Sequence, residues 1–226
     1  MSSLKGKRIL ITSGGTIEKW DSVRGHTNLA KGIMGCYLAE EALRKEAEVI
    51  YLHGYFSKLP DNHKKMTLYQ FEGIYDLGKK IKKLVQSEHI DVVIMAAAGS
   101  DWVIDKVLDH NGNPISEVGK MSSDEPPIIH FKKAPKLLSE IKKWNPNLLL
   151  IGFKLEHTDD INYLIERANL RMNTSNADFM VANKSGSLYG EDQVHYIVSN
   201  TRRYQSYSSK SETAKGLIYL LEVYLS

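Results

Sequence analysis

The chain has 226 residues, of which 42% are hydrophobic and 25% charged, so it can bury a sizeable core and fits neither a disordered nor a fibrous protein. Its formal net charge of +3 is too small to indicate a nucleic-acid-binding protein, and it suits an anionic small substrate. The single cysteine, Cys36, excludes an internal disulfide, and we expect it to be a buried apolar residue rather than a nucleophile.

The sequence contains no candidate membrane segment. Its longest apolar run, 148–153, has the length of a strand and falls far below the roughly 20 residues that a transmembrane helix needs. Residues 1–7 lack the apolar core of a signal peptide. We therefore expect a soluble, cytoplasmic protein that does not associate with membranes.

Short apolar runs alternate with segments of helical periodicity along the chain. Strands are expected at 8–12, 48–52, 91–98, 148–153 and 179–183, with an antiparallel pair at 195–199 and 203–207. Helices are expected at 34–44, 74–85, 135–144, 161–172 and 212–225. Continuously apolar strands between amphipathic helices are typical of a parallel sheet covered on both faces. We therefore predict an α/β fold: a single Rossmann-like domain over 1–226 with a doubly wound, mostly parallel sheet.

One stretch, from Trp102 to His130, breaks this rhythm after the third predicted strand. It is rich in Gly, Asn, Pro and Ser, and it predicts an irregular insertion. Long insertions at the carboxyl end of a strand usually form lids, arms or binding loops.

The segment Gly14-Gly15-Thr16 follows the first predicted strand directly. Two glycines there allow the backbone to approach a ligand closely, and the N–H groups can bind phosphate oxygens. The segment matches neither the G-x-G-x-x-G fingerprint nor a P-loop, so a tight turn remains the alternative.

Three further polar residues lie in predicted loops. Arg24 can hold a phosphate or carboxylate with two N–H groups, and Asn28 can donate its amide to a developing oxyanion. Lys120 lies next to glycine and serines in the insertion, where it can fold over bound phosphates. In each case, an ordinary loop residue is the alternative.

Polar or small residues also follow several strands. Ala97 and Asp101 come after the third strand, where small residues leave room for a planar ligand and Asp101 can bind a sugar hydroxyl or cap the next segment. Lys154 and Glu156 should share a strand face and either form an ion pair or line the site. Asn183 lies at the end of the fifth strand. The carboxyl ends of these strands meet at one edge, which predicts a binding site there.

Other classes of site are not indicated. The histidines are scattered without metal-ligand spacing, so no protein-bound metal is predicted, although magnesium can be held through substrate phosphates. No G-x-S-x-G motif is present, which argues against an α/β-hydrolase.

Taken together, the motifs resemble the phosphopantothenoylcysteine synthetase family, from Lys7 to about Asn183 and more weakly beyond. They are, in order, Gly14-Gly15-Thr16, Asp21-x-Val23-Arg24-x-x-x-Asn28, Gly32-x-Met34-Gly35, Ala96-Ala97-Ala98-x-x-Asp101, Lys120-Met121-Ser122-Ser123, Phe153-Lys154-Leu155-Glu156 and Val181-Ala182-Asn183. Each motif is weak alone, and the ordered set is specific.

The resemblance implies a homodimeric ligase of coenzyme A biosynthesis. In that family the carboxylate of 4'-phosphopantothenate attacks the α-phosphate of a nucleoside triphosphate, pyrophosphate leaves, and the amine of L-cysteine then attacks the acyl-nucleotidylate. Among the matching positions, Asn28 would serve the second step and Lys120 the first. Contacts with nucleotide or substrate are implied for Gly14, Gly15, Thr16, Arg24, Ala97, Asp101, Phe153 and Asn176.

The sequence departs from the family at two points. Many members are fused behind a flavin-dependent decarboxylase, for which this chain has no room, so we expect no flavin and a separate decarboxylase as a candidate partner. Many members read Ser-Ser-Gly-Lys-Met-Gly where this chain has residues 30–35. The co-substrate is expected to be CTP, with ATP as the alternative, together with Mg²⁺.

Two other functions are weighed against the ligase. A short-chain-type NAD(P)-dependent reductase shares the fold but needs the missing glycine fingerprint and a Tyr-x-x-x-Lys pair. A non-catalytic nucleotide-binding partner of a decarboxylase would leave Asn28 and Lys120 dispensable.

Overall fold

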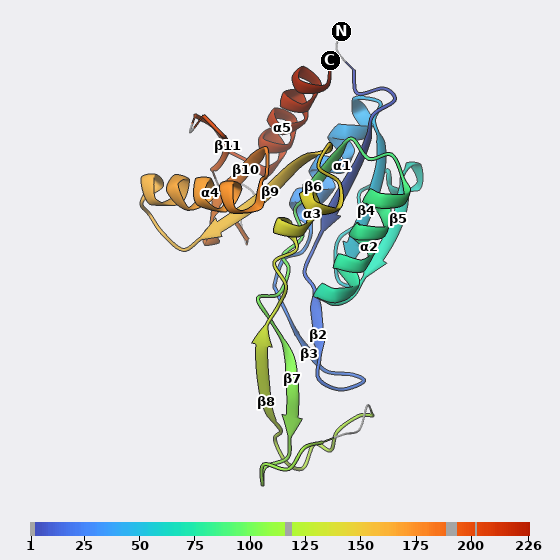
Figure 1. Ribbon diagram of the computed structural model, residues 1–226, viewed down its shortest axis with the longest axis vertical. Helices are drawn as coiled ribbons and strands as arrows, with labels where there is room; N and C mark the ends of the chain where they lie inside the picture. Colours follow the sequence, from blue (N-terminus) through green and yellow to red (C-terminus); the bar gives the residue numbers. More distant parts are fainter. Residues whose placement is uncertain (1–2, 116–118, 189–193, 202) are drawn as a thin grey trace.

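The computed structural model describes residues 3–115, 119–188, 194–201 and 203–226. Its centre is an eight-stranded sheet with the order β12-β11-β10-β9-β6-β1-β4-β5 (Figure 1). These strands are β1 Arg8–Ser13, β4 Glu48–Gly54, β5 Thr67–Phe71, β6 Val92–Met95, β9 Leu149–Glu156, β10 Phe179–Lys184, β11 His195–Ser199 and β12 Tyr204–Tyr207. The helices are α1 Ile33–Arg44, α2 Ile74–Ser87, α3 Leu138–Trp144, α4 Ile161–Ser175 and α5 Lys210–Leu225, with short 3-10 turns at η1 His63–Lys65 and η2 Ser185–Leu188.

The sheet is parallel from β5 to β10, and only β11 and β12 run antiparallel to their neighbours. The chain starts in the middle at β1, adds β4 and β5 on one side, and then returns to add β6, β9 and β10 on the other. This is the doubly wound order, and β1 and β6 flank the point where the winding reverses. The predicted fold class and the predicted antiparallel pair are therefore confirmed.

Alternate residues of the strands feed two cores. Leu10 and Leu52 face the side covered by α2, α3 and α4, whereas Ile9 and Ile11 face the side covered by α1 and α5. All four side chains are completely buried. Because each strand is buried on both faces, it reads as a continuous apolar run in the sequence.

Polar residues cap the ends of α4 and α5. Asp160 accepts hydrogen bonds from the N–H groups of Asn162 and Tyr163 and so caps α4, and Ser209 caps α5 through the N–H of Glu212. At its other end, α4 stops at Asn176, whose φ of 53° is the left-handed conformation that asparagine tolerates well.

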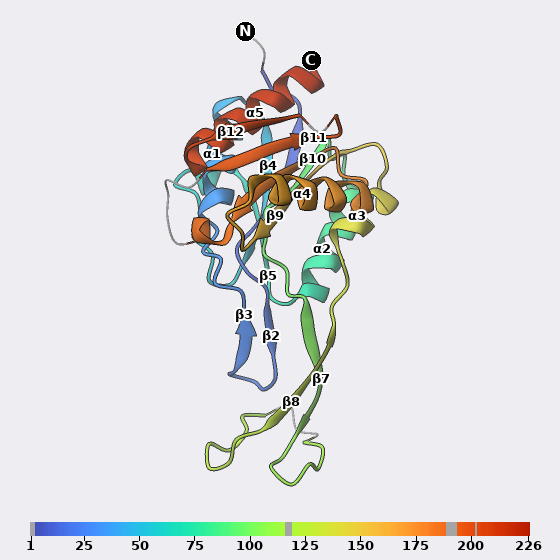
Figure 2. The ribbon, with the colours of Figure 1, turned by 90° about the vertical axis from the view of Figure 1, so that its left-hand side faces the viewer.

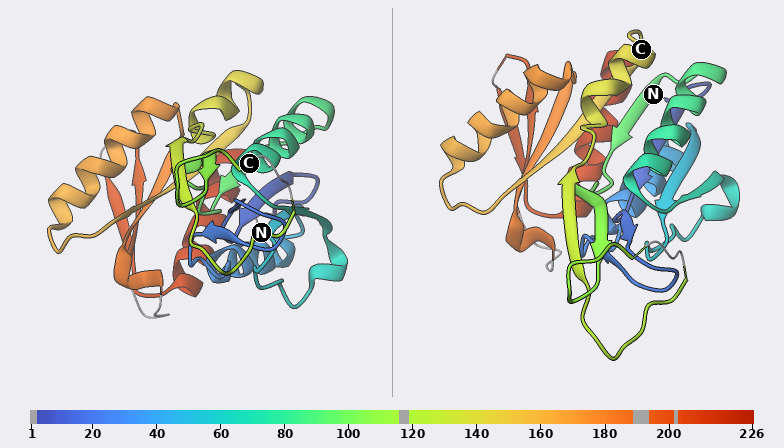
Figure 3. Two further views of the ribbon diagram at one scale, coloured as in Figure 1. Left: turned by 90° about the horizontal axis from the view of Figure 1, so that it is seen from below. Right: turned by 60° about the horizontal axis from the view of Figure 1, so that its bottom comes forward.

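Two ribbons extend from the carboxyl end of the sheet (Figures 1 and 2). One is a short hairpin of β2 (Ile17–Lys19) and β3 (Gly25–Thr27), and the other, which we call the arm, pairs β7 (Trp102–Leu108) with β8 (Ile128–Lys133). Seen from that end of the sheet, the arm lies in front of the strands (Figure 3). The predicted irregular insertion is thus a paired ribbon with a long loop at its tip.

The hairpin is tied to the sheet domain at its base. The buried Glu18 carboxylate accepts the N–H of Ile74 at 2.9 Å and so occupies the N-terminus of α2, where a negative charge is favourable. The N–H of Ile17 donates to the carbonyl of Glu72 at 2.8 Å. Among the residues that the structure describes, no helix combines the length and apolar character that crossing a membrane requires.

Candidate active site

The carboxyl ends of β1 and β6 are joined by main-chain contacts into a continuous seam. The N–H of Ala98 donates to the carbonyl of Gly14 at 2.8 Å, and the N–H of Thr16 donates to the carbonyl of Ala98 at 3.2 Å. The hydroxyl of Thr12 accepts the N–H of Ala97 at 3.1 Å. The residues after β1 and those after β6 therefore hold fixed positions relative to each other.

Gly14 is required in this seam for two reasons. Its φ of +83° lies in the left-handed region, and a Cβ atom there would lie 1.5 Å from the hydroxyl oxygen of Ser57. No other residue type satisfies both conditions. Gly14 lies on the wall of a cavity, and its predicted contact with a ligand stays a prediction.

A cavity of about 630 Å³ opens at the seam on the side of α2, α3 and α4, and we call it the large cavity. Its lining includes five predicted site residues, Asn28, Ala97, Asp101, Phe153 and Lys154, together with the basic residues Lys136, Arg167 and Arg171. Four cations and one carboxylate give this wall an excess of positive charge. Such a wall suits a polyanion.

The cations of the large cavity differ in how they are neutralised. Lys136 pairs with Asp101, while Lys154 and Arg167 both pair with Glu156, at 2.9 and 3.2 Å. The hydrogen bond from Lys154, assisted by Arg167, lowers the pKa of Glu156 although burial opposes this. Arg171 forms no ion pair with a described residue, so its charge is the one most available to a ligand.

Asn28 lies where the hairpin returns to the seam. Its side-chain amide donates to the carbonyl of Ala98 at 3.0 Å, and the preceding Thr27 donates its hydroxyl to the carbonyl of Thr16 at 2.7 Å. A primary amide has two N–H bonds, so the second remains available to a ligand in the large cavity. This geometry suits an oxyanion donor.

A second cavity of about 200 Å³, the small cavity, lies on the α1 side of the same seam. Ala97, Ala98, Phe153 and Leu155 line both cavities and so form the wall between them. The small cavity is otherwise lined by the N-terminal turn of α1, by Gly14, and by the buried side chains of Asn183, His195 and Lys210.

Two predicted residues lie away from both cavities. Arg24 is in the hairpin turn, with its guanidinium 3.5 Å from the carboxylate of Asp21, and Lys120 is exposed in the arm-tip loop. The same Asp21 oxygen accepts the N–H of Met121 at 3.3 Å. Asp21 therefore brings Arg24 and Lys120 to one end of the molecule, while Asn28 and the cavity residues lie at the other end of the hairpin.

Three further predicted site residues are not among the described residues that line either cavity. Thr16 is fully buried, and its hydroxyl accepts the N–H of Ser100 at 3.0 Å, so its side chain supports the seam rather than facing a cavity. Gly15 pairs with Ala98 in the seam. Asn176 is the left-handed cap of α4, and neither cavity has it in its described lining.

Comparison with known proteins identifies the family. Residues 4–224 match the family model described as the DNA/pantothenate metabolism flavoprotein C-terminal domain. The chain belongs to this family. The resemblance to the phosphopantothenoylcysteine synthetases is thereby confirmed at the level of the family.

Several relatives are similar to this chain in sequence and in fold. The coenzyme A biosynthesis bifunctional protein CoaBC of Methanocaldococcus jannaschii is 34% identical over 95% of this chain, and the chain spans about half (50%) of that relative's length. The crystal structure of the DNA/pantothenate metabolism flavoprotein from Streptococcus pneumoniae has a TM-score of 0.86 and 27% identity, covering 97% of this chain and 100% of the other. The crystal structure of the C-terminal domain of CoaBC has a TM-score of 0.77 and 28% identity, covering 100% and 98%.

The residues on the cavity walls that were not predicted from sequence include Lys136, Arg167, Arg171, His195 and Lys210. Arg167 and Arg171 carried a usable signal, because residues four apart on a helix lie on the same face. The other three carried none, since each was one of many polar residues at the border of a predicted element.

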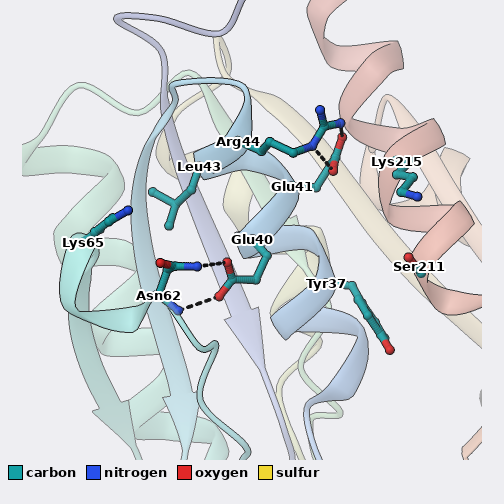
Figure 4. Close-up of a pocket in the computed structure, with 9 residues that line it drawn as sticks. All are labelled: Tyr37, Glu40, Glu41, Leu43, Arg44, Asn62, Lys65, Ser211 and Lys215. Carbon is teal, nitrogen blue, oxygen red and sulfur yellow. Dashed lines mark hydrogen bonds and ion pairs between the residues drawn. The ribbon is translucent and has the colours of Figure 1, made fainter.

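A third pocket, of about 450 Å³, lies between α1, α5 and the η1 turn (Figure 4). The Glu40 carboxylate accepts both the backbone and the side-chain N–H of Asn62 at 2.7 Å, and Glu41 pairs with Arg44 (Figure 4). None of the predicted site residues lines this pocket, and its acidic groups are already satisfied.

The described residues contain no group of three or more histidine, cysteine, aspartate or glutamate side chains suited to hold a metal ion. Cys36 is buried, as predicted, and its thiol donates a hydrogen bond to the carbonyl of Lys58 at 3.3 Å.

Proposed function

We propose that the chain is the ligase that joins 4'-phosphopantothenate to L-cysteine through an acyl-nucleotidylate, using CTP, or ATP as the alternative. The observation that carries this proposal is the large cavity, where four cations from three segments surround a space beside Asn28. The names of the relatives, which belong to coenzyme A biosynthesis, support the same assignment.

In the first step, the large cavity would bind the nucleoside triphosphate. Arg171, Lys154 and Arg167 provide charge for the phosphates, and Asp101 is available to a ribose hydroxyl once Lys136 turns toward phosphate. The substrate carboxylate attacks the α-phosphorus, the bond to the β-phosphate oxygen breaks, and pyrophosphate leaves. Phosphoryl transfer of this kind is accelerated mainly by positioning and by positive charge.

Lys120 and Arg24 require a second chain in this proposal. Both lie at the far end of the hairpin from Asn28, and the arm that carries Lys120 exposes Trp102, Ile128 and Phe131 to solvent by 43–52%. Exposed apolar side chains on a projecting ribbon favour contact with another protein surface. We infer a homodimer in which the arm of one chain brings Lys120 to the large cavity of the other.

In the second step, the amine of cysteine attacks the acyl carbon, and the negative charge on the acyl oxygen would be stabilised by the second N–H of Asn28. The bond between the acyl carbon and the phosphate oxygen then breaks, and nucleoside monophosphate leaves. One preorganised donor of this kind typically contributes about 10²–10³ in rate.

Magnesium would neutralise the triphosphate in the first step. The chain would work as one domain over 1–226 in the cytoplasm, with a separate decarboxylase as its candidate partner. The nucleotide would be influenced only indirectly by three predicted residues. Gly15 and Thr16 would hold the seam in place, and Asn176 would fix the end of α4. Arg24 would contact substrate across the dimer.

The test is a direct assay. Purified protein is mixed with magnesium, 4'-phosphopantothenate, cysteine, and CTP or ATP, and both pyrophosphate and 4'-phosphopantothenoylcysteine are measured. We expect pyrophosphate release without cysteine and product only with it. Absence of pyrophosphate with either nucleotide would exclude the ligase and favour the non-catalytic alternative.

A further inference from the structure

The arm leaves the sheet domain through a narrow root. The N–H of Ala134 donates to the carbonyl of Asp101 at 3.0 Å, and Trp102 and Lys133 form the first pair of the ladder beyond it. A ribbon of two strands has little stability of its own, so the direction of the arm depends on what it contacts. The hairpin runs beside the first part of the arm, and its strand β2 packs on β7 (Figures 1 and 2).

The hairpin is held to the sheet domain through both of its strands. The carboxylate of Glu18 in β2 accepts the N–H of Ile74 at 2.9 Å. The hydroxyl of Thr27 in β3 donates to the carbonyl of Thr16 at 2.7 Å. The hairpin therefore keeps its orientation relative to the sheet and can support the arm beside it.

His26, the middle residue of β3, contacts both strands of the arm. Its Nε2 atom lies 3.1 Å from the carbonyl oxygen of Trp102 in β7, and 3.1 Å from the hydroxyl oxygen of Ser100 just before that strand. Its ring meets the ring of Phe131 in β8 edge to face, with the centroids 4.9 Å apart. One side chain of the hairpin thus holds both strands of the arm at the root.

The polar contacts of His26 are made through Nε2. A carbonyl oxygen only accepts hydrogen bonds, so the proton of the neutral ring belongs on Nε2, facing Trp102. The other ring nitrogen, Nδ1, is buried and has no hydrogen-bond partner among the described residues. Ser100 donates its hydroxyl to the same Trp102 carbonyl at 2.6 Å. The donor on Nε2 is therefore the feature that a substitute for histidine must keep.

This joint lies between the two groups on which the proposed mechanism depends. Asn28 follows His26 by two residues and lines the large cavity, whereas Lys120 lies in the loop at the far end of the arm. His26 itself is not among the described residues that line either cavity. A small rotation at the root displaces the tip of the arm by much more. A misplacement of about 1 Å at a catalytic group can slow a reaction about 10²-fold.

We propose that His26 is a positioning residue for the first step, because it holds the root of its own arm on the hairpin and so places Lys120 in the active site of the partner chain. The proposal rests on the proposed ligase function and on its dimer. His26 touches no reactant, and its effect on the rate passes through Lys120 rather than through Asn28.

The first experiment measures the two steps separately. The acyl-nucleotidylate is quantified by mass spectrometry of quenched single turnovers, first as it forms from nucleotide and 4'-phosphopantothenate, and then as it disappears after cysteine is added. In His26→Leu, which keeps apolar bulk against Phe131 but loses the donor, we expect formation to slow about 10–100-fold. The reaction with cysteine should stay within a few-fold of wild type. His26→Gln, whose amide can place an N–H where Nε2 lies, should restore formation to within a few-fold.

The second experiment identifies the residue through which His26 acts. Two variants are mixed, their subunits are exchanged, and product formation is measured. A dimer of His26→Leu with Asn28→Asp contains one site with an intact cavity and an intact arm, so about a quarter of wild-type activity should return. In a dimer of His26→Leu with Lys120→Gln, each site receives either the misplaced arm or the arm without its lysine. Activity should then stay near that of the separate variants.

Several outcomes would contradict the proposal. Rescue by Lys120→Gln and not by Asn28→Asp would show that His26 acts on Asn28, and rescue by neither would show a general defect of the chain or sites that are not shared between chains. Unchanged formation in His26→Leu, or formation as slow in His26→Gln as in the leucine variant, also overturns it.

A control and a reference measurement accompany both experiments. His89→Leu replaces a histidine whose side chain is 85% exposed and should behave as wild type. If wild-type protein releases no pyrophosphate with either nucleotide, the proposed function itself has failed. If wild-type protein is active and the His26 variants give one of the contrary outcomes, only the role of His26 is wrong.

Discussion

The side-chain amide of Asn28 donates a hydrogen bond to the main-chain carbonyl of Ala98 at 3.0 Å, across 70 residues of sequence. Ala98 is itself held to Gly14 and Thr16 by two further hydrogen bonds. The amide of Asn28 is thus oriented by backbone that other substitutions hardly change, and its chemistry can be tested without moving its surroundings.

Replacing Asn28 by Asp exchanges an N–H donor for an oxygen of nearly the same shape. The carboxylate repels both the Ala98 carbonyl and an acyl oxyanion, so we expect product formation to fall about 10²–10³-fold. Pyrophosphate release should continue and the acyl-nucleotidylate should accumulate, which mass spectrometry of the quenched reaction would detect. Asn147→Asp, at an exposed position before β9, should behave as wild type. Equal loss of pyrophosphate release would argue against a role confined to the second step.

Replacing Lys120 by Gln should abolish pyrophosphate release, because the charge that covers the α-phosphate is lost. Lys106→Gln, exposed on the same arm, is the control and should retain activity.

Mixing the two inactive variants tests the proposed dimer. If Asn28 and Lys120 of different chains form one site, half of the mixed dimers' sites carry both changes and the other half carry none, so about a quarter of wild-type activity should return after subunit exchange. Activity that stays at background after exchange, with mixed dimers verified by mass spectrometry, would place both residues in the same chain's site.

Arg171 and Arg167 lie four residues apart on α4, but of the two only Arg167 has an ion-pair partner among the described residues, Glu156. Burial lowers the pKa of Arg171, with Asp101 acting in the opposite direction. We expect Arg171→Met to raise the KM for the nucleotide about 10–100-fold, in keeping with loss of a charge-assisted contact. Arg167→Met should raise it less, since its charge is already shared. Initial rates against nucleotide concentration decide this, and a larger effect at Arg167 would contradict it.

Gly14 and Gly112 both have left-handed backbone, so comparing substitutions at the two positions distinguishes the cost of backbone strain from the cost of a steric clash. At Gly112, with φ +86°, an added Cβ atom would have nothing within 4 Å, so Gly112→Ala should cost only about 1–2 kcal/mol. Gly14→Ala must also displace Ser57 and should cost clearly more. Adding Ser57→Gly should recover the difference relative to Ser57→Gly alone. Urea unfolding measures the free energy of unfolding of the wild type and of the four variants. Equal losses in Gly112→Ala and Gly14→Ala would show that the seam can relax.

Asp21 makes the contact between hairpin and arm tip dependent on pH. Burial alone would raise the pKa of this carboxyl, but the N–H groups of Val23, Arg24 and Met121 and the charge of Arg24 bring it below the ordinary value of 3.8. A lowered pKa in the folded state means that the stabilisation is complete above 3.8 and disappears as the pH falls through the lower value.

Hydrogen exchange should therefore show a Met121 amide that stays protected from neutral pH down to about 4 and loses protection only in stronger acid. Asp21→Asn should lose most of this protection already at neutral pH. Asp105→Asn, on the arm but paired with Lys132 at the surface, is the control. Equal protection in wild type and Asp21→Asn would show that other contacts hold the arm tip.

The strands buried on both faces were predictable from sequence, and most of the exposed strands were not, although the exposed β12 was predicted with its partner β11. Strands β1, β6 and β10 are buried on both faces and stand out as apolar runs. The edge strand β5 is mostly exposed and was missed. The strands of the arm were missed for the same reason, since β8 buries no residue and reads as a mixed polar segment.

The residues of the candidate site also differ in how far the sequence could predict their positions. Residues at strand ends, such as Ala97, Asp101 and Lys154, were predictable because parallel strands bring their carboxyl ends to one edge, whereas Phe153 was assigned by resemblance. Lys120 was assigned by motif, but sequence alone gives no direction for a projecting arm. Asn176 was assigned by resemblance, whereas its local environment is explained by the left-handed end of α4.

The wall between the two cavities is built from Ala97, Ala98, Phe153 and Leu155, so two of its four residues are alanines. Substitutions in the helices on either side can therefore change the size or charge of one cavity without changing this wall. Members of the family that differ in the ligands they bind are expected to differ first in these helices.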